Sequence, residues 1–362
     1  MSNIDLLKKA VKERRDPVFE VVSKPRASKF SDWEKAEYEK LKPRLRKLDV
    51  KLGKKGAHGR NIDIYSCAEL EKIYGRKNLC LKVFSNSKSI WGIENSSAPT
   101  TIIESTIAQN LLAMKGICPR VYDLVSVGGK TVQVTEYPSG PAKSGVPVDS
   151  NFEFWEDPWN CGYNYVGGQM VDFEGTRLKS YGRYKRDLLK ETSIRNEANG
   201  HCRGMYQSVD QHRGIRDTKE RLDQYQFRGF KNKAILDIGC SNGMFCRAAC
   251  DLGAKRVVGI DYPNMVEMAE KLAILDGYFN IDFYGADLKT LTREELKELT
   301  GIKRFNIHLF FAMENHVGWA DWVKNCDTLY YEGHGQPRPF EVFNYKKQQK
   351  AKKGSKRARK KQ

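Results

Sequence analysis

The 362-residue sequence lacks three patterns that would each place it in a familiar class. No apolar run approaches the ~20 residues that a membrane-spanning helix needs, so we expect neither a membrane protein nor a membrane partner. The start, MSNIDLLKKAVKERR, has no apolar block of the kind that a secretory signal carries. The nine cysteines include no C-x-x-C pair, which argues against a zinc site and favours reduced thiols in a cytoplasm.

Acidic residues are absent from the end of the chain, at positions 346–362. This tail reads KKQQKAKKGSKRARKKQ and contributes ten of the positive charges behind the formal net charge of +18. Because so charged a segment has nothing apolar to bury, we expect it to be disordered. Two functions fit the tail. It is either an arm that binds nucleic acid through the phosphates without choosing a sequence, or a solubilising end.

The rest of the sequence has the composition of a globular protein, with 40% hydrophobic and 11% aromatic residues. The length is sufficient for two domains that each have a core. Composition and periodicity predict a charged helical extension at 1–50, an α+β module at 51–180, connecting helices at 181–230, an α/β domain at 231–345 and the disordered basic tail at 346–362.

The clearest pattern in the chain lies at 231–261. It opens with the short apolar run Ala234-Ile235-Leu236, which is typical of a buried strand, and passes through a glycine-bearing turn into a helix at 244–252. A second strand, at 256–260, ends on Asp261. A β-α-β unit with a glycine turn after its first strand and an acid after its second suits a nucleoside, because the carboxylate can accept both ribose hydroxyls.

The glycine turn separates two classes of nucleotide cofactor. A dinucleotide fold expects G-x-G-x-x-G, whereas this turn reads D-x-G-x-x-x-G. The leading acid would repel a pyrophosphate but can accept a hydrogen bond from the ammonium group of S-adenosylmethionine, which has no phosphate. The segment resembles the cofactor-binding half of class I S-adenosylmethionine-dependent methyltransferases. This resemblance implies S-adenosyl-L-methionine as cofactor, bound by Asp237, Gly239, Ser241, Gly243 and Asp261. The alternative is a Rossmann-like turn that binds another nucleotide or none.

Two flanking segments extend this resemblance. One of them has Tyr206-Gln207-Ser208 followed by Gly214-Ile215-Arg216-Asp217, a G-x-R-D pattern. This order resembles the lead-in of some methyltransferases, including those acting on tRNA wobble uridine derivatives. The resemblance implies that Arg216 clamps the methionine carboxylate, for which a planar guanidinium is well shaped. The alternative is a salt bridge between Arg216 and a nearby acid. After the predicted strand 281–284, Asp287 stands where the resembled family has the acid that faces the adenine amine.

The alternation of strands and helices from about 206 to 343 predicts an α/β fold with a Rossmann-like, doubly wound, mostly parallel sheet. The strand predicted at 305–311 ends at the carboxyl edge of this sheet, where open α/β folds place their chemistry. Methyl transfer needs alignment, and it needs a base only when the acceptor oxygen or nitrogen must lose a proton. The candidate catalytic residues on this edge are Glu314, His316, Glu332 and His334, each of which is equally well a local hydrogen-bonding residue.

The module at 51–180 has a second recognisable order of elements. Glycines at 53, 56 and 59 precede a strand with Lys82, a helix with Glu104 and a hairpin. This order resembles the N-terminal lobe of protein kinases and implies that Lys82, Glu104 and the acid of the later D-F-E-G, Asp172, take part in nucleotide binding. The loop is G-x-x-G-x-x-G, however, and no H-R-D frame is present. The alternative is an α+β module without phosphoryl transfer.

The sequence therefore predicts a methyltransferase that acts on an oxygen or nitrogen atom of an unidentified acceptor. Three classes of acceptor remain open. They are a nucleic acid that binds through the basic tail, a small molecule, and a protein. Two other functions remain as alternatives. One is a bifunctional kinase–methyltransferase, and the other is a nucleic-acid- or partner-binding protein with a vestigial methyltransferase core.

Overall fold

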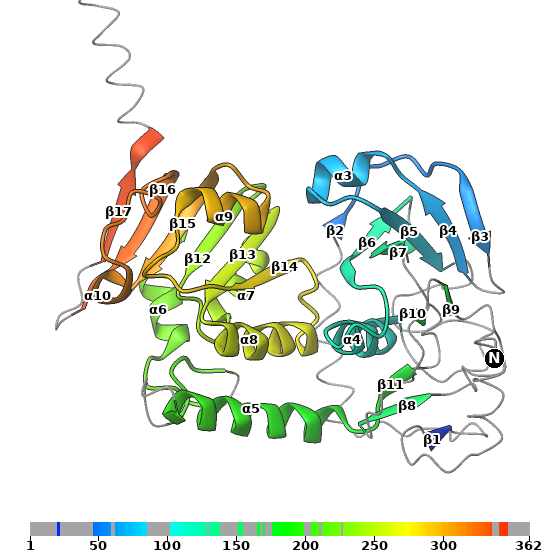
Figure 1. The fold of residues 1–362 in the computed structure, drawn as a ribbon, viewed down its shortest axis with the longest axis horizontal. Helices are drawn as coiled ribbons and strands as arrows, with labels where there is room; N and C mark the ends of the chain where they lie inside the picture. Colours follow the sequence, from blue (N-terminus) through cyan, green and yellow to red (C-terminus); the bar gives the residue numbers. More distant parts are fainter. Residues whose placement is uncertain are drawn as a thin grey trace, which may run out of the picture. The chain divides into compact units, whose positions relative to one another are not determined.

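The computed structural model describes a set of ranges: 20–21, 46–58, 62–84, 102–128, 130–137, 151–154, 165–166, 169–170, 176–198, 204–209, 212–225, 227–334 and 340–346 (Figure 1). The extension predicted at 1–50 lies mostly outside these ranges, and so does the basic tail after Lys346. The chain divides into two units, Met1–Arg186 with Ile274–Phe279 and Asp187–Ala273 with Asn280–Gln362. Each unit contains its own six-stranded sheet.

The sheet of the second unit is mostly parallel (Figure 1). Its strands are β12 (Ala234–Ile238), β13 (Arg256–Asp261), β14 (Ile281–Gly285), β15 (Phe305–Phe311), β16 (Cys326–Glu332) and β17 (Phe340–Asn344), in the order β14-β13-β12-β15-β16-β17. All neighbours pair in parallel except β16 and β17, which are antiparallel. Because the chain moves to one side of β12 for β13 and β14 and to the other side for β15 and β16, the loops diverge between β12 and β15. The α/β sheet predicted from the sequence is therefore present.

From residue 181 onward, the described helices are α5 (Tyr181–Ala198), α6 (Thr218–Tyr225), α7 (Met244–Asp251), α8 (Pro263–Leu275), α9 (Arg293–Thr300) and α10 (Glu314–Val317). Helix α9 shows how local sequence determines the bounds of an element. The Thr292 hydroxyl accepts from the Glu295 backbone N–H at 3.2 Å, and the Glu295 carboxylate accepts from the Thr292 N–H at 2.7 Å, which together form a capping box. Gly301 ends the helix with a φ of +68°.

The core of the second unit is built from the apolar residues of its central strands. Leu236, Ile238, Val258, Ile260 and Phe310 belong to one buried cluster and are each 1% exposed or less. Burying a side chain of this size stabilises a fold by ~1.5–3 kcal/mol. Since the strands are buried on both faces, their sequences read as continuous apolar runs and not as alternating ones. This packing holds the carboxyl ends of the strands in a rigid frame.

A buried histidine, His308, lies in the middle of β15. It is 1% exposed, and its Nδ1 lies 2.7 Å from the carbonyl oxygen of Val323. Burial lowers the pKa of His308 from 6.5 to about 4, with the positive charge of Arg304 acting in the same direction and the hydrogen bond with Val323 opposing it. The folded protein therefore keeps this imidazole neutral at pH values where the unfolded chain binds a proton.

We expect this histidine to make the fold sensitive to mild acid. The unfolded chain binds more protons than the folded one between the two pKa values, so stability that is present above the unfolded pKa is lost as the pH falls through the folded pKa. The loss should reach ~3 kcal/mol, at 1.36 kcal/mol per unit of pKa. Urea unfolding of the wild type and His308→Leu at several pH values between about 7 and 4 measures it. Parallel pH dependences in the two proteins would contradict the expectation.

The sheet of the first unit is mixed, with mainly antiparallel pairs. It consists of β2 (Arg46–Lys47), β3 (Lys55–His58), β4 (Ile62–Ser66), β5 (Leu79–Phe84), β6 (Val121–Val127) and β7 (Lys130–Glu136), in the order β2-β6-β7-β5-β4-β3. Helices α3 (Glu69–Tyr74) and α4 (Ile102–Ala113) belong to the same unit. The short strands β1 (Glu20–Val21), β8 (Phe152–Phe154) and β11 (Thr176–Leu178) form a small sheet, and β9 (Tyr165–Val166) pairs with β10 (Gln169–Met170).

The residues predicted to bind a nucleotide are only partly described. Lys82 pairs in register with Gln133, whose amide donates to the Thr106 hydroxyl of α4 at 2.7 Å. Opposite residues of an antiparallel pair share a sheet face, so Lys82 lies on the face towards α4, the helix that carries Glu104. Lys82 is 5% exposed and Glu104 3% exposed. Asp172 lies outside the described residues. The likeness to a kinase lobe stays a prediction.

Candidate functional site

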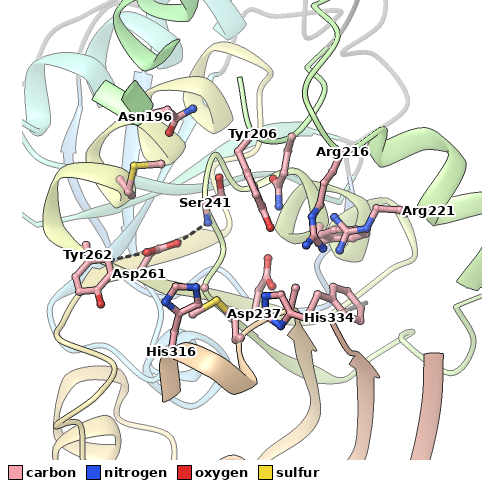
Figure 2. Close-up of a pocket in the computed structure, with 17 residues that line it drawn as sticks. Asn196, Tyr206, Arg216, Arg221, Asp237, Ser241, Asp261, Tyr262, His316 and His334 are labelled. Carbon is pink, nitrogen blue, oxygen red and sulfur yellow. Dashed lines mark hydrogen bonds between the residues drawn. The ribbon is translucent and has the colours of Figure 1, made fainter. Parts of the chain in front are cut away.

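A cavity of about 310 Å³ lies at the carboxyl edge of the sheet of the second unit (Figure 2). Its wall includes residues at the ends of β12, β13 and β15 and residues from the segment around α6. Seven residues predicted from the sequence line it: Arg216, Asp237, Gly239, Ser241, Asp261, His316 and His334. The point where the strand order reverses is therefore also the point where the predicted residues meet.

The turn after β12 has a backbone that favours glycine. Gly239 and Gly243 have φ values of +73° and +76°, in the left-handed region that side chains rarely adopt. A Cβ atom at Gly239 would lie 2.3 Å from Sδ of Met313, which lines the same cavity. Ser241 also has a positive φ, of +52°. At Gly239 the backbone of the turn therefore forms part of the cavity wall without a side chain, whereas Gly243 does not line the cavity.

Asp261 ties this turn to the end of β13 (Figure 2). One carboxylate oxygen accepts from the Ser241 backbone N–H at 2.7 Å, and the other accepts from the Tyr262 N–H at 2.8 Å. Two backbone donors fix the orientation of the carboxylate, which is 8% exposed. A carboxylate has about four acceptor positions, so Asp261 can accept further hydrogen bonds from a ligand hydroxyl.

Asp237, at the start of the turn, is 2% exposed and accepts from the Cys246 thiol at 3.3 Å. Burial raises the pKa of Asp237 from 3.8 to about 7. The Cys246 hydrogen bond opposes this shift, the charge of Asp261 adds to it, and the charge of Arg221 opposes it. An ammonium group placed beside this carboxyl group would favour its charged form. Asp237 is thus suited to a cationic part of a ligand.

Two arginines share one buried carboxylate beside the cavity. Glu332, the last residue of β16, is fully buried, with one oxygen 3.3 Å from Nη1 of Arg216 and the other bonded to Nη2 of Arg221. Both arginines line the cavity, and Figure 2 shows their guanidinium groups converging near Asp237. Arg221 is 5% exposed, and its Nη1 has no hydrogen-bond partner among the described residues.

This cluster bears on the roles predicted for Glu332 and Arg216. Glu332, a candidate base, does not line the cavity and is held by two arginines, so it is not placed to take a proton from an acceptor. Arg216 lines the cavity and forms a salt bridge with Glu332, which was its alternative role, while its contact with a methionine carboxylate stays a prediction. Arg221 was missed, although it follows Arg216 by little more than one helical turn.

Glu314 and His334 form a hydrogen-bonded pair on the cavity rim. Oε1 of Glu314 accepts from the His334 backbone N–H at 2.6 Å and lies 2.8 Å from its Nδ1. Burial raises the pKa of Glu314, but hydrogen bonds from the His334 backbone, its own backbone and the His334 side chain outweigh this and lower the pKa below 4.5. A carboxylate beside Nδ1 favours the imidazole tautomer that carries its proton on that nitrogen, in which Nε2 is the acceptor. The ring of His316 lies 6.4 Å away.

Asp287 is not brought into the site. It is exposed, follows β14, and accepts from the Lys289 backbone N–H at 3.0 Å in a local turn. It is not among the residues that line the cavity, so its implied contact with adenine is without support in this arrangement. Tyr206, Tyr262 and Met265 do line the cavity, and their nearness in sequence to predicted residues was the only signal for them.

The described residues include no group of three or more histidine, cysteine, aspartate or glutamate side chains that is suited to a metal ion. Among the described helices, none has the length and apolar character needed to cross a membrane. The cysteines that the structure describes are free thiols, and Cys240 and Cys246 beside the cavity are both buried.

Residues 235–325 match the family model described as "Methyltransferase domain". The chain is 37% identical over 70 residues to protein arginine N-methyltransferase 1 of Saccharomyces cerevisiae, a match that covers 19% of this chain and spans 18% of the relative. It is 27% identical over 171 residues to a protein of Methanocaldococcus jannaschii, covering 40% of this chain and 74% of the relative.

Solved structures resemble the chain only distantly. The bifunctional kinase-methyltransferase WbdD is 19% identical with a TM-score of 0.29, covering 40% of this chain and 36% of that one. A putative S-adenosylmethionine-dependent methyltransferase from Listeria monocytogenes is 20% identical with a TM-score of 0.26, covering 32% of this chain and 53% of that one. Scores this low carry no argument about function. The residues that match the methyltransferase-domain model, 235–325, hold β13, β14, β15 and nearly all of β12 of the parallel sheet.

Proposed function

We propose that the chain is an S-adenosylmethionine-dependent methyltransferase that acts on an oxygen or nitrogen atom. One observation carries the proposal: a single cavity at the switch point of the sheet is lined by acids and arginines. The arginines and Asp237 lie near one another, whereas Asp261 is held by the backbone of the glycine turn. A ligand with an ammonium group, a carboxylate and a ribose has the matching set of polar groups.

The residues present fit this cofactor. Asp261 would accept from the ribose hydroxyls and Asp237 from the ammonium group. The carboxylate would bind Arg221 and Arg216. The strongest support is Nη1 of Arg221, a buried donor without a partner among the described residues. Such an atom costs a fold ~1–3 kcal/mol, and a bound carboxylate would remove that cost.

The chemistry divides between the cofactor and the chain. The cofactor supplies an activated methyl group on a sulfonium and leaves as a neutral thioether. The protein aligns the acceptor in line with this group and, where needed, removes a proton. His334 is the best placed base, because Glu314 holds its Nδ1 at 2.8 Å and both His334 and His316 line the cavity. An acceptor hydroxyl or amine would transfer its proton to Nε2 of His334.

For the acceptor, we propose nucleic acid. Support comes from the formal net charge of +18 and from the ten lysines and arginines at 346–362, which attract phosphates by releasing counterions. A protein acceptor is the second candidate, because the arginine methyltransferase of Saccharomyces cerevisiae matches 70 residues of the chain. Incubation with a labelled cofactor and separate RNA, DNA, protein and small-molecule fractions would distinguish the two.

The Asp261→Ala variant tests the proposed cofactor site. It should weaken the binding of S-adenosylhomocysteine about 10- to 100-fold, because hydrogen bonds to a charged group contribute ~1.5–3 kcal/mol. Isothermal titration calorimetry measures the change, and Glu298→Ala, an exposed acid of α9, is the matched control. Equal affinities in the wild type and Asp261→Ala would contradict the ribose contact. No binding by the wild type would overturn the proposed function.

A further inference from the structure

A row of aromatic rings lies on the outer part of the sheet of the second unit. The Trp319 ring lies 4.9 Å from that of Tyr331 and 6.1 Å from that of Phe343, and the rings of Phe343 and Tyr345 stack at 6.2 Å with an angle of 8° between their planes. We call Trp319, Tyr331, Phe343 and Tyr345 the aromatic ladder. It runs over β16 and the edge strand β17, which Figure 1 shows side by side.

The ladder is only partly covered by the protein. Trp319 is 40% exposed, and the other three rings are neither fully buried nor fully exposed. The inner side of the ladder rests on Phe310, a core residue whose ring lies 5.5 Å from that of Trp319. Rings fixed on one side and open to solvent on the other provide flat surfaces on which a planar ligand can stack.

Charges of both signs lie beside the ladder, and the sequence that follows it is strongly basic. Nζ of Lys324 lies 5.5 Å from the centre of the Trp319 ring. Tyr345 is followed by Lys346 and then by the rest of the basic tail, where 346–362 holds ten lysines and arginines and no acid. The nearby Asp327 is balanced by Arg304 at 3.2 Å and by Lys346 at 3.9 Å. Two acids, Glu314 and the exposed Glu341 of β17, lie close enough to Tyr331 to add to the rise in its pKa that burial causes.

The ladder also leads to the proposed active site. Trp319 follows His316 by three residues, and His316 lines the cavity. Burial, the charge of Glu314 and a hydrogen bond with Glu314 raise the pKa of Tyr331, and Glu314 lies 2.8 Å from Nδ1 of His334, which lines the cavity. A strand of nucleic acid lying along the ladder would therefore pass close to the cavity mouth within the same unit.

We propose that the aromatic ladder, with Lys324 and Lys346 beside it, binds single-stranded nucleic acid. Bases stack on Trp319, Phe343 and Tyr345, while Lys324 and Lys346 contact phosphates. This is the combination of aromatic platforms and cationic contacts by which single strands are bound without choice of sequence. The charge of the chain end favours a polyanion over an apolar peptide. One part of this inference rests on the proposed function, namely that the bound nucleic acid carries the methyl acceptor.

The test measures the binding of a fluorescein-labelled oligouridine of about 15 nucleotides by anisotropy across a salt series. Trp319→Ala and Tyr345→Ala should each weaken binding about 5- to 100-fold and leave the salt dependence unchanged, because they remove stacking and not charge. Trp319→Phe should retain most of the affinity. Deleting 347–362 should instead reduce the salt dependence, and Glu341→Gln should strengthen binding at low salt. Tyr137→Ala, at a ring that is 48% exposed in the first unit, is the control.

Either of two results would overturn the proposal. In one, Trp319→Ala and Tyr345→Ala bind the oligouridine as tightly as Tyr137→Ala. In the other, a duplex of the same length binds equally well and is insensitive to both changes, so that only charge is recognised. Calorimetry with S-adenosylhomocysteine on the same variants should give wild-type affinities, which shows that the fold is intact. Failure of the wild type to bind this compound would remove the proposed function but not the nucleic-acid surface.

Discussion

Replacing Glu332 with alanine should destabilise the second unit by ~3–5 kcal/mol, the usual cost of removing one partner from a buried ion pair. Glu332 is fully buried, and its two oxygens hold Arg216 and Arg221, whose side chains are 10% and 6% exposed. Without Glu332, two guanidinium groups would remain next to the cavity with no carboxylate between them. Urea unfolding followed by circular dichroism measures the loss.

The matched control is Asp327→Ala, which removes the partner of Arg304 in a more exposed pair at 3.2 Å. Exposed pairs contribute ~0–1 kcal/mol, so this change should have little effect. Adding Arg221→Met to Glu332→Ala should restore part of the stability, because one uncompensated charge is then removed. If Glu332→Ala were as stable as Asp327→Ala, Glu332 would have no structural role, and its role as a base would need to be considered again.

Replacing Arg221 with methionine should weaken the binding of S-adenosylhomocysteine about 10- to 100-fold, since a hydrogen bond between charged groups contributes ~1.5–3 kcal/mol. The same change should leave the affinity for 5′-methylthioadenosine almost unaltered, because this compound keeps the nucleoside and lacks the amino acid part. The reason is geometric: Nη1 of Arg221 is buried, lacks a partner among the described residues, and belongs to a side chain that lines the cavity. Calorimetry with both compounds gives the two affinities.

Arg256→Met is a suitable control, because Arg256 pairs with Asp282 at 3.1 Å and does not line the cavity. It should change neither affinity. An equal loss of both ligands in Arg221→Met would indicate that the arginine only supports the fold of the cavity. An unchanged affinity for S-adenosylhomocysteine would show that the carboxylate binds elsewhere.

The sequence by itself was sufficient for the part of the site that belongs to consecutive elements. Asp237, Gly239, Ser241 and Asp261 lie within one β-α-β unit and meet in the cavity. A parallel fold brings the ends of successive strands to one edge, so position along the chain predicts position in space. The sequence also predicted the bounds of a strand. β15 was predicted at 305–311 and is observed as Phe305–Phe311, a largely apolar run.

Local pattern was a poor guide where an element is short or exposed. Helix α10 has four residues, little more than one turn, so no apolar period marks it in the sequence. Asp287 follows a predicted strand as Asp261 does, yet it is exposed in a local turn and takes no part in the cavity wall. The difference between the two acids lies in their neighbours, because two backbone N–H groups hold Asp261 against the glycine turn.

Only the tertiary structure decided the contacts between distant residues. Arg221 and Glu332 are 111 positions apart, and they meet because the fold places α6 beside the end of β16. Glu314 and His334 pair because β15 and β16 are parallel neighbours that end together. Glu332 is buried and bound to two arginines, which its place in the sequence does not reveal, and the pairing of β16 with β17 brings the rings of the aromatic ladder together. Such contacts depend on strand order and on burial, which a single sequence does not encode locally.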